Sequence, residues 1–220
     1  MANHLAYTHL YMFIVAEAMD FSWLIQGEYA AAYAFCDEDP NENAKERHAR
    51  QHGHAFWLLQ QMLISMDLWK EEVFGVPATS PLAIRAMEER MDRGVDGKPF
   101  FTGKAGNILF NITHTKGLVA CVVSTTRDVG IDAECPREVS EAVILRVCSK
   151  EEQDAIRRAP RAFFKAWTYK EAYSKFLGEG FHAGFETLDS CHPPKCVDVM
   201  VYDVTDGTRD YVITICGGVL

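Results

Sequence analysis

The stretch NILFNITHTKGLVACVVSTTRDVGIDAE, residues 107–134, decides how this chain folds. Apolar residues alternate with others across residues 108–112, which predicts a half-buried strand. Residues 118–124 form a nearly continuous apolar run that is rich in valine, the composition of a strand buried on both faces. Residues 129–134 follow after a turn. We therefore expect three strands in succession.

Helices are expected before and after these strands in the sequence. Apolar residues recur at helical spacing across residues 44–69, and residues 162–177 predict a second long helix. A shorter helix is expected over residues 82–93. Ser149 predicts the start of another, because Glu152 three residues later completes a capping box.

The C-terminal end of the chain gives a clear prediction, and the N-terminal end leaves two alternatives. Residues 197–202 and 211–216 predict two strands joined around Asp206 and Gly207. Residues 10–16 are apolar and form either a buried strand or the start of a helix, because periodicity does not decide between the two.

The bulk properties are those of an ordinary soluble globular protein. The 220 residues suit one large domain or two small ones, with 48% hydrophobic and 24% charged residues. A formal net charge of −9 argues against generic binding to nucleic acid or to an anionic membrane. A polyphosphate ligand would therefore have to meet a local cluster of cations or a metal ion.

The sequence also bears on the compartment. The apolar run at residues 10–16 is short and has no basic region before it, so it fits neither a signal peptide nor a membrane span. The seven cysteines are odd in number and include no C-x-x-C pair. Both observations predict reduced thiols in a cytoplasmic protein.

Asp132 and Glu134 stand two residues apart in a predicted strand. Alternate side chains share one face, so both carboxylates point the same way while Ile131 and Ala133 point into the core. Two hard oxygen ligands at a strand end suit Mg²⁺, which takes one or two protein carboxylates together with phosphate oxygens. The alternative is an acidic strand end that is simply solvated.

The helix over residues 162–177 adds to this pair. Trp167, Glu171 and Lys175 repeat every four residues and lie along one face of the helix. Glu171 would complete a set of three carboxylates, with Lys175 one turn further on to meet phosphate charge. The alternative is an exposed Glu–Lys pair contributing about 0.2–0.5 kcal/mol. Trp167 on the same stripe favours a partly enclosed surface.

His114 lies just past a strand, between Thr113 and Thr115 and before Lys116. Imidazole and hydroxyl groups donate hydrogen bonds and Lys116 adds charge, so this segment suits phosphate binding. The alternative is an ordinary turn histidine. Lys98 has a similar ambiguity, because a lysine in a Gly-Lys-Pro turn is often merely exposed.

Two further clusters invite a metal interpretation and are set aside. The first comprises Asp189, Cys191, His192 and Cys196. Its spacing matches no common structural zinc site, which favours a loop with incidental cysteines. The second comprises His48, His52 and His54. It lacks an acidic ligand at useful spacing, which favours a polar helix face, although these side chains remain candidates for phosphate contacts.

Four segments, taken in order, resemble a known family. They are G-K-P-F at residues 97–100, N-I-T-H-T at 111–115, G-I-D-A-E at 130–134 and W-T-Y-K-E-A-Y-S-K at 167–175. Their order and spacing are similar to those of the 4'-phosphopantetheinyl transferases of the larger type, named for the enzyme that activates surfactin synthetase (the Sfp type). The similarity covers somewhat over a third of the chain.

The resemblance implies an α+β fold of two similar halves packed as a pseudo-dimer, residues 1–127 and 128–220, with coenzyme A in the cleft between them. It implies a monomer that transfers 4'-phosphopantetheine from coenzyme A to a serine of an apo acyl, peptidyl or aryl carrier protein and releases 3',5'-ADP. Residues 178–201 would carry much of the carrier-docking surface. Neither nucleic acid nor a membrane is an expected partner.

The resemblance also implies roles for individual residues. Mg²⁺, or Mn²⁺ in its place, would be held by Asp132, Glu134 and Glu171. Coenzyme A would be contacted by Lys98, Pro99, Thr113, His114 and Lys175. Glu171, or a water on the metal, would accept the serine proton, and Lys175 would neutralise the phosphate.

The sequence departs from the family pattern at two places, and two alternative functions remain. Thr113 and Thr115 stand where serines are usual, and no arginine occurs at residues 53–56, where one is expected to hold the 3'-phosphate. The preference for coenzyme A over dephospho-coenzyme A is therefore open. The alternatives are a non-catalytic protein that binds coenzyme A or a carrier, and an unrelated metal-dependent phosphotransferase that acts on a free nucleotide.

Overall fold

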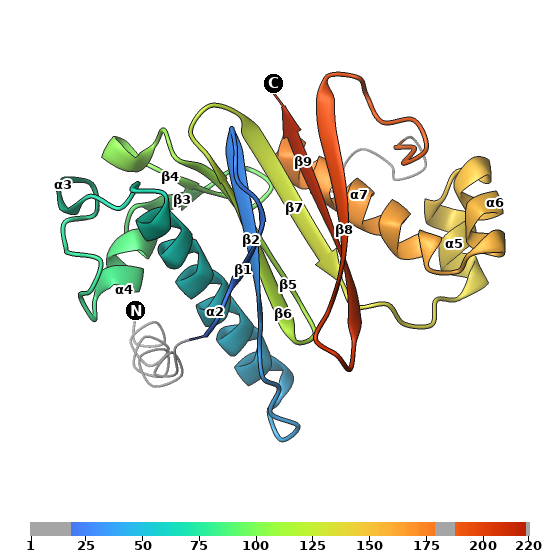
Figure 1. Cartoon of the computed structure of the whole chain (residues 1–220), viewed down its shortest axis with the longest axis horizontal. Coiled ribbons are helices and arrows are strands. Elements are labelled where there is room, and N and C mark those ends of the chain that lie inside the picture. The colour runs from blue at the N-terminus through green and yellow to red at the C-terminus, as the bar shows by residue number, and fades with distance from the viewer. Residues whose placement is uncertain (1–18, 179–187, 219–220) are drawn as a thin grey trace.

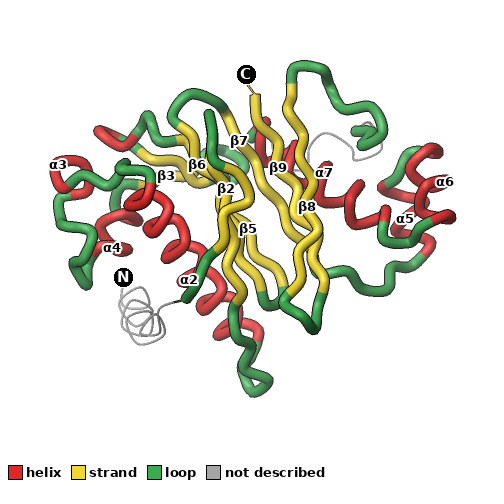
Figure 2. The backbone as a smooth tube through the Cα atoms, in the orientation of Figure 1, coloured by secondary structure: helices red, strands yellow, loops and turns green. Residues whose placement is uncertain are grey.

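A computed structural model of the chain describes residues 19–178 and 188–218. Two stacked β-sheets occupy its centre and helices lie on both sides of them (Figures 1 and 2). The strands are β1 (Ser22–Ile25), β2 (Tyr29–Phe35), β3 (Met91–Arg93), β4 (Pro99–Phe101), β5 (Leu109–Thr115), β6 (Leu118–Ser124), β7 (Asp128–Glu134), β8 (Val197–Thr205) and β9 (Asp210–Gly218). The α-helices are α2 (Ala44–Ser65), α3 (Glu71–Phe74), α4 (Ala83–Glu88), α5 (Glu141–Val147), α6 (Lys150–Arg158) and α7 (Ala162–Leu177).

All strand pairing in the described part of the chain is antiparallel. The first sheet has the order β1-β2-β6-β5 and the second has the order β7-β9-β8, while β3 and β4 form a separate two-stranded ribbon. Helices and antiparallel sheets together make a mixed α+β fold, as expected.

Strand β6 shows how the layers are stacked. Val119, Cys121 and Val123 belong to the apolar cluster that includes α2, whereas the alternate residues Ala120 and Val122 belong to the cluster shared with the second sheet. Because successive side chains of a strand point to opposite faces, the first sheet is sandwiched between α2 and the second sheet. Helix α7 covers the remaining face of the second sheet (Figure 1).

Helix α7 approaches β7 very closely, and Gly130 is the reason. A Cβ atom added at Gly130 would lie 2.1 Å from the Ala172 carbonyl oxygen and 2.4 Å from the Phe176 backbone nitrogen. Only glycine leaves room for backbone at that distance. The glycine of the G-I-D-A-E segment therefore sets how near the helix carrying Glu171 comes to the strand carrying Asp132.

Several predicted elements are confirmed. Strand β6 and helix α7 have the predicted bounds, and Gly178 ends α7 in the left-handed conformation with φ of 73°. Ser149 and Glu152 form the predicted capping box at the start of α6. The two final strands form the predicted pair and are longer than expected, because their pairing continues from Val197 to Thr205.

Two predicted helices need correction. Helix α2 ends at Ser65 rather than at residue 69, since Asp67 adopts a left-handed φ of 55° that turns the chain. The helix expected over residues 82–93 is confined to α4, because residues 91–93 pair with β4 instead. This hairpin pairing overrides the helical pattern of residues 91–93. Residues 10–16 lie outside the described residues.

None of the helices within residues 19–178 and 188–218 combines the length and the hydropathy that a membrane-spanning segment needs.

Candidate active site

A cavity of about 450 Å³ brings the predicted motif residues together. Its walls come from α2, β5, β7 and α7, with Pro99 of β4 at one side. The lining falls into two chemical groups. The first consists of the carboxylates Asp132, Glu134 and Glu171 with Lys175 and Trp167. The second consists of the imidazoles His48, His52 and His114 with Arg93.

Asp132 is the most buried of the three carboxylates, with 6% of its surface exposed. Its Oδ1 atom accepts a hydrogen bond from Lys175 Nζ at 2.7 Å and another from Thr113 Oγ1 at 3.1 Å. Lys175 Nζ also donates to the Ile131 carbonyl oxygen at 3.2 Å. Strand β7, strand β5 and helix α7 thus meet at one carboxylate oxygen.

Glu171 faces the same cavity from α7. Burial, with a further contribution from the nearby charges of Asp132 and Glu134, raises the pKa of its carboxyl group to about 7, and Lys175 opposes the shift. A carboxylate that ionises near neutral pH is suited to exchange a proton with a ligand.

The three carboxylates offer hard oxygen donors, which are the ligands that Mg²⁺ and Mn²⁺ prefer. Burial and mutual repulsion disfavour the ionised form of Glu171, and a bound cation would relieve that repulsion. The donor set therefore fits a divalent cation. Two ion pairs hold the carboxylates apart: Asp132 is drawn to Lys175, and Glu134 Oε2 to Arg137 Nη1 at 2.7 Å.

Across residues 19–178 and 188–218, three potential ligand atoms lie within 4.8 Å of one another only at Glu151, Asp189 and His192. This cluster is at the surface, and Asp189 Oδ2 already contacts His192 Nδ1 at 3.0 Å. It contains two members of the group set aside in the sequence, but neither of the cysteines Cys191 and Cys196. Bringing Asp132, Glu134 and Glu171 onto one cation would require their ligand atoms to move closer together.

The second group in the cavity is an imidazole cluster on α2 and β5. The ring of His48 lies 5.6 Å from that of His114 and 6.3 Å from that of His52, measured between centroids. Burial, together with the neighbouring His48 and Lys175, lowers the pKa of His114 to about 4. His114 is therefore neutral at pH 7 and enters the cavity as a hydrogen-bonding group rather than as a cation.

The cavity collects most, but not all, of the residues that the sequence singled out. Those that line it are Pro99, Thr113, His114, Asp132, Glu134, Trp167, Glu171 and Lys175. The side chain of Lys98 takes another direction: its Nζ donates to the carbonyl oxygens of Val129 at 3.3 Å and Phe176 at 3.4 Å. Burial lowers the pKa of Lys98.

Three lining residues were set aside or not identified from the sequence. The sequence predicts that His48 and His52 lie on a polar helix face and are candidates for phosphate contacts, and in the structure both line the cavity. Arg93 was placed in a helix and belongs to strand β3, which brings it to the cavity wall. The helical spacing of His48 and His52 showed that they share one face, but no local signal showed that this face meets His114.

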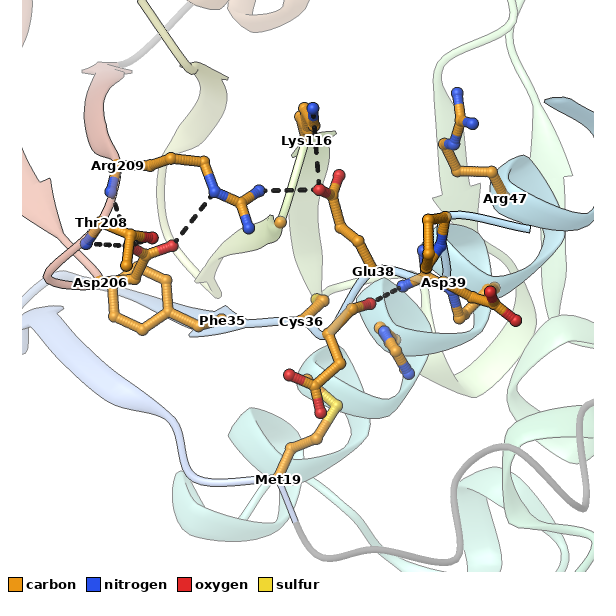
Figure 3. Close-up of a pocket in the computed structure, with 15 residues that line it drawn as sticks. Met19, Phe35, Cys36, Glu38, Asp39, Arg47, Lys116, Asp206, Thr208 and Arg209 are labelled. Carbon is orange, nitrogen blue, oxygen red and sulfur yellow. Dashed lines mark hydrogen bonds and ion pairs between the residues drawn. The ribbon is translucent and has the colours of Figure 1, made fainter. Parts of the chain in front are cut away.

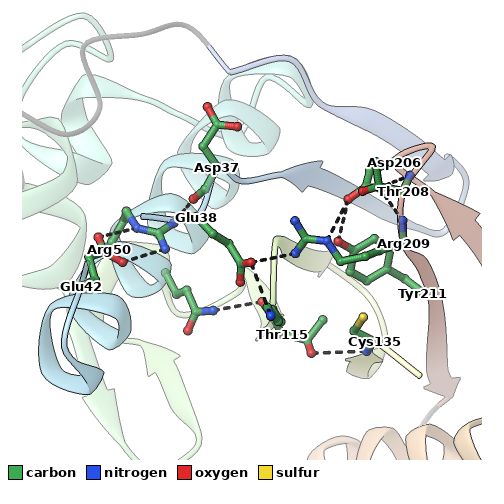
Figure 4. Close-up of polar contacts among 12 residues, drawn as sticks. Asp37, Glu38, Glu42, Arg50, Thr115, Cys135, Asp206, Thr208, Arg209 and Tyr211 are labelled. Carbon is green, nitrogen blue, oxygen red and sulfur yellow. Dashed lines mark hydrogen bonds and ion pairs between the residues drawn. The ribbon is translucent and has the colours of Figure 1, made fainter. Parts of the chain in front are cut away.

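A second, larger cavity of about 1120 Å³ lies beside α2 and receives Lys116 and His54 (Figure 3). Its cationic side chains Arg50, Lys116 and Arg209 are matched by carboxylates. Arg209 contacts Glu38 at 3.0 Å and Asp206 at 3.6 Å, and Lys116 approaches Glu38 at 3.9 Å. Figure 4 shows this network together with the separate Arg50–Glu42 pair. These contacts join the β8–β9 turn to the loop after β2.

Comparisons with known proteins agree with this arrangement. Residues 128–216 match the family described as the 4'-phosphopantetheinyl transferase superfamily. The chain is 33% identical over 108 residues to the 4'-phosphopantetheinyl transferase HetI of Nostoc sp. (strain PCC 7120), covering 45% of this chain and 46% of that protein. It is also 33% identical over 91 residues to the 4'-phosphopantetheinyl transferase gsp of Aneurinibacillus migulanus, covering 39% of this chain and 37% of that protein.

The chain thus spans less than half the length of either relative. The matched family region contains β7 and α7, and hence Asp132, Glu134, Glu171 and Lys175. The family match and the two relatives agree with the motif order, and they show that residues 128–216 of this chain are similar to the 4'-phosphopantetheinyl transferase superfamily.

Proposed function

We propose that this protein transfers the 4'-phosphopantetheine group of coenzyme A to a serine of an apo acyl, peptidyl or aryl carrier protein and releases 3',5'-ADP. One observation carries the proposal. The carboxylates of β7 and α7, the lysine of α7 and the histidine of β5 line a single cavity in a chain that matches the transferase superfamily.

The roles of the residues follow from their chemistry. Asp132, Glu134 and Glu171 would hold Mg²⁺ or Mn²⁺, which would neutralise charge on the pyrophosphate of coenzyme A. Lys175 would leave Asp132 to meet the transferred phosphate. Glu171, or a water on the metal, would take the proton of the attacking serine hydroxyl. The serine oxygen then bonds to the β-phosphorus, and the bond to the departing 3',5'-ADP breaks.

The remaining contacts concern the nucleotide. Pro99 and His114 line the cavity and are proposed to contact the adenosine phosphates, as is Lys98 if its side chain leaves the carbonyl oxygens of Val129 and Phe176. Thr113 also lines the cavity, where its hydroxyl group donates to Asp132 instead. His48, His52 and Arg93 add nitrogen donors beside His114. They take the place of the arginine that residues 53–56 lack.

The overall arrangement is also part of the proposal. Residues 1–127 and 128–220 would be the two similar halves of a pseudo-dimer, with coenzyme A between them. The cavity supports this, because it is lined both by α2 and β5, which precede residue 127 in the sequence, and by β7 and α7, which follow it. We further propose a cytoplasmic monomer.

Intact-mass measurement tests the activity directly. The protein would be incubated with coenzyme A, Mg²⁺ and apo-carriers of the acyl, peptidyl and aryl classes. At least one class of carrier is expected to gain the mass of phosphopantetheine. Glu171→Gln should abolish the gain while the thermal unfolding temperature stays close to that of the wild type. If no carrier class gains mass, the proposed activity is wrong. Metal-dependent binding of coenzyme A without any transfer would then favour the non-catalytic alternative.

A further inference from the structure

Strand β7 is an edge strand of the second sheet. Strand β9 pairs with one side of it, and the other side faces β5 of the first sheet without a backbone ladder. Side chains meet its backbone on that side. The Ile131 amide donates to Asn111 Oδ1 at 3.1 Å, and the Cys135 amide donates to Thr115 Oγ1 at 3.4 Å (Figure 4 shows the second contact).

Asn111, Thr113 and Thr115 alternate along β5, so they project from the same face of that strand. The intervening residues Phe110 and Ile112 pack in the cluster around α2 on the opposite face. Between the two backbone contacts, Thr113 Oγ1 donates to Asp132 Oδ1 at 3.1 Å. The three polar side chains therefore meet β7 before, at and after its acidic pair.

Burial makes these contacts consequential. Asn111 and Thr113 are 3% and 6% exposed, so their polar atoms have little access to water. A buried amide or hydroxyl group without a partner is costly, and each of these groups has its partner on β7. The sequence alone suggested that the hydroxyl groups of Thr113 and Thr115 donate to phosphate. In the folded chain both are engaged with β7.

We propose that Asn111, Thr113 and Thr115 form a polar ladder that fixes β7 against β5, and that Thr113 is a positioning residue for Asp132. This inference rests on the proposed function, because it concerns the carboxylate that would hold the metal ion. Groups that hydrogen-bond to a metal ligand orient it, and their loss commonly weakens metal binding by about 10–100-fold. Thr113 thus acts on the cation through Asp132.

Thr113→Val removes the hydroxyl group and keeps the shape of the side chain. We expect Mn²⁺ binding, measured by calorimetry on the full chain without coenzyme A, to weaken by about 10–100-fold. Binding of coenzyme A in the presence of a chelator should be unchanged. Thr113→Ser, which keeps the hydroxyl group, should restore Mn²⁺ binding. Thr102→Val is the matched control, since Thr102 Oγ1 donates to the Arg90 carbonyl oxygen, away from β7.

The results separate positioning from direct phosphate binding. If Thr113→Val weakens coenzyme A binding in chelator and leaves Mn²⁺ binding intact, Thr113 is a phosphate contact and the inference is overturned. Unchanged Mn²⁺ binding in Thr113→Val overturns it as well, while transfer by the wild type would still uphold the proposed function.

A second measurement examines the ladder without metal or activity. Asn111→Ala should speed hydrogen exchange at the Ile131 amide, followed by NMR, and Asn111→Asp, which keeps an acceptor oxygen, should restore protection. Equal exchange in all three proteins would refute the ladder, whatever the transfer assay shows.

Discussion

Lys175 Nζ lies 2.7 Å from Asp132 Oδ1, so the cation of α7 and the most buried carboxylate of β7 are directly paired. The pair is not sealed from water, because 30% of the Lys175 side chain is exposed to the cavity. A cation held at the rim of a cavity by one strong partner is able to exchange that partner for a phosphate oxygen at little cost.

Lys175→Gln is therefore expected to separate activity from stability. The amide of glutamine still donates to Asp132, but this buried carboxylate loses a charged partner, so the free energy of unfolding should fall by about 1–3 kcal/mol. The charge that would meet the phosphate is lost, and kcat for carrier modification should fall by about 10²–10³-fold. Urea unfolding and steady-state transfer assays measure the two effects. Lys165→Gln serves as control, since Lys165 pairs with Asp203 on the exposed side of the same helix.

Glu171 should give the metal-free protein a distinct dependence of stability on pH. Its pKa is raised from 4.5 to about 7 in the folded state, chiefly by burial. Between these values the folded state keeps a proton that the unfolded state has lost, so this group makes the free energy of unfolding decrease as pH rises. Below pH 4.5 both states are protonated, so this group no longer makes the free energy of unfolding depend on pH. Glu171→Gln should lose this slope, which urea titrations at several pH values would show; a slope equal to that of the wild type would contradict the assignment.

Gly130→Ala should disrupt the contact between β7 and α7. The added methyl group would meet backbone atoms of Ala172 and Phe176 at less than 3 Å, and backbone cannot rotate away as a side chain does. We expect a loss of about 3 kcal/mol or more in the free energy of unfolding and no measurable transfer. Gly27→Ala is the matched control, because the nearest atom to its added Cβ, the Tyr29 carbonyl oxygen, lies at 4.0 Å. Wild-type stability in Gly130→Ala would show that α7 is not held as close as described.

Lys170 forms a fully buried ion pair behind the site. Its Nζ lies 2.9 Å from Glu152 Oε2, and the side chains are 0% and 1% exposed. Glu152 also accepts hydrogen bonds from the amides of Ser149 and Ser190. Lys170→Met would leave that carboxylate buried without its cation, which costs about 3–5 kcal/mol. Chemical denaturation should show this loss, whereas Lys165→Met, at an exposed pair, should change the free energy of unfolding by about 1 kcal/mol or less.

The imidazole cluster should determine the choice of nucleotide. If His48 and His52 contact the 3'-phosphate, the double variant His48→Ala/His52→Ala loses hydrogen bonds to a charged group and the KM for coenzyme A rises about tenfold or more. The KM for dephospho-coenzyme A, which lacks that phosphate, should stay the same. An equal rise for both nucleotides would place the cluster elsewhere on the ligand.

The carboxylate set was predictable because two local periodicities define it. A period of two puts Asp132 and Glu134 on one face of a strand, and a period near four puts Trp167, Glu171 and Lys175 on one face of a helix. Each rule needs only the chain's own spacing. Placing both faces on one cavity drew on the resemblance to the family, and the structure brings them together there.

Other features depended on contacts that spacing does not encode. The direction of Lys98 is set by the carbonyl oxygens of Val129 and Phe176, which are distant in sequence. Strand β3 exists because β4 pairs with it, although residues 82–93 alone favour a helix. His48 and His52 reach the cavity because α2 packs against the first sheet, a relationship between elements rather than within one.

The apolar layer between the two sheets has a consequence for cutting the chain. Leu118 and Ala120 of the first sheet and Ile131 and Ile213 of the second are each fully buried in this one layer. A chain cleaved in the short turn at residues 125–127 would yield two fragments, each exposing an apolar sheet face to solvent. Neither piece should be soluble by itself, and co-expression of both should reconstitute the protein as a non-covalent complementation pair.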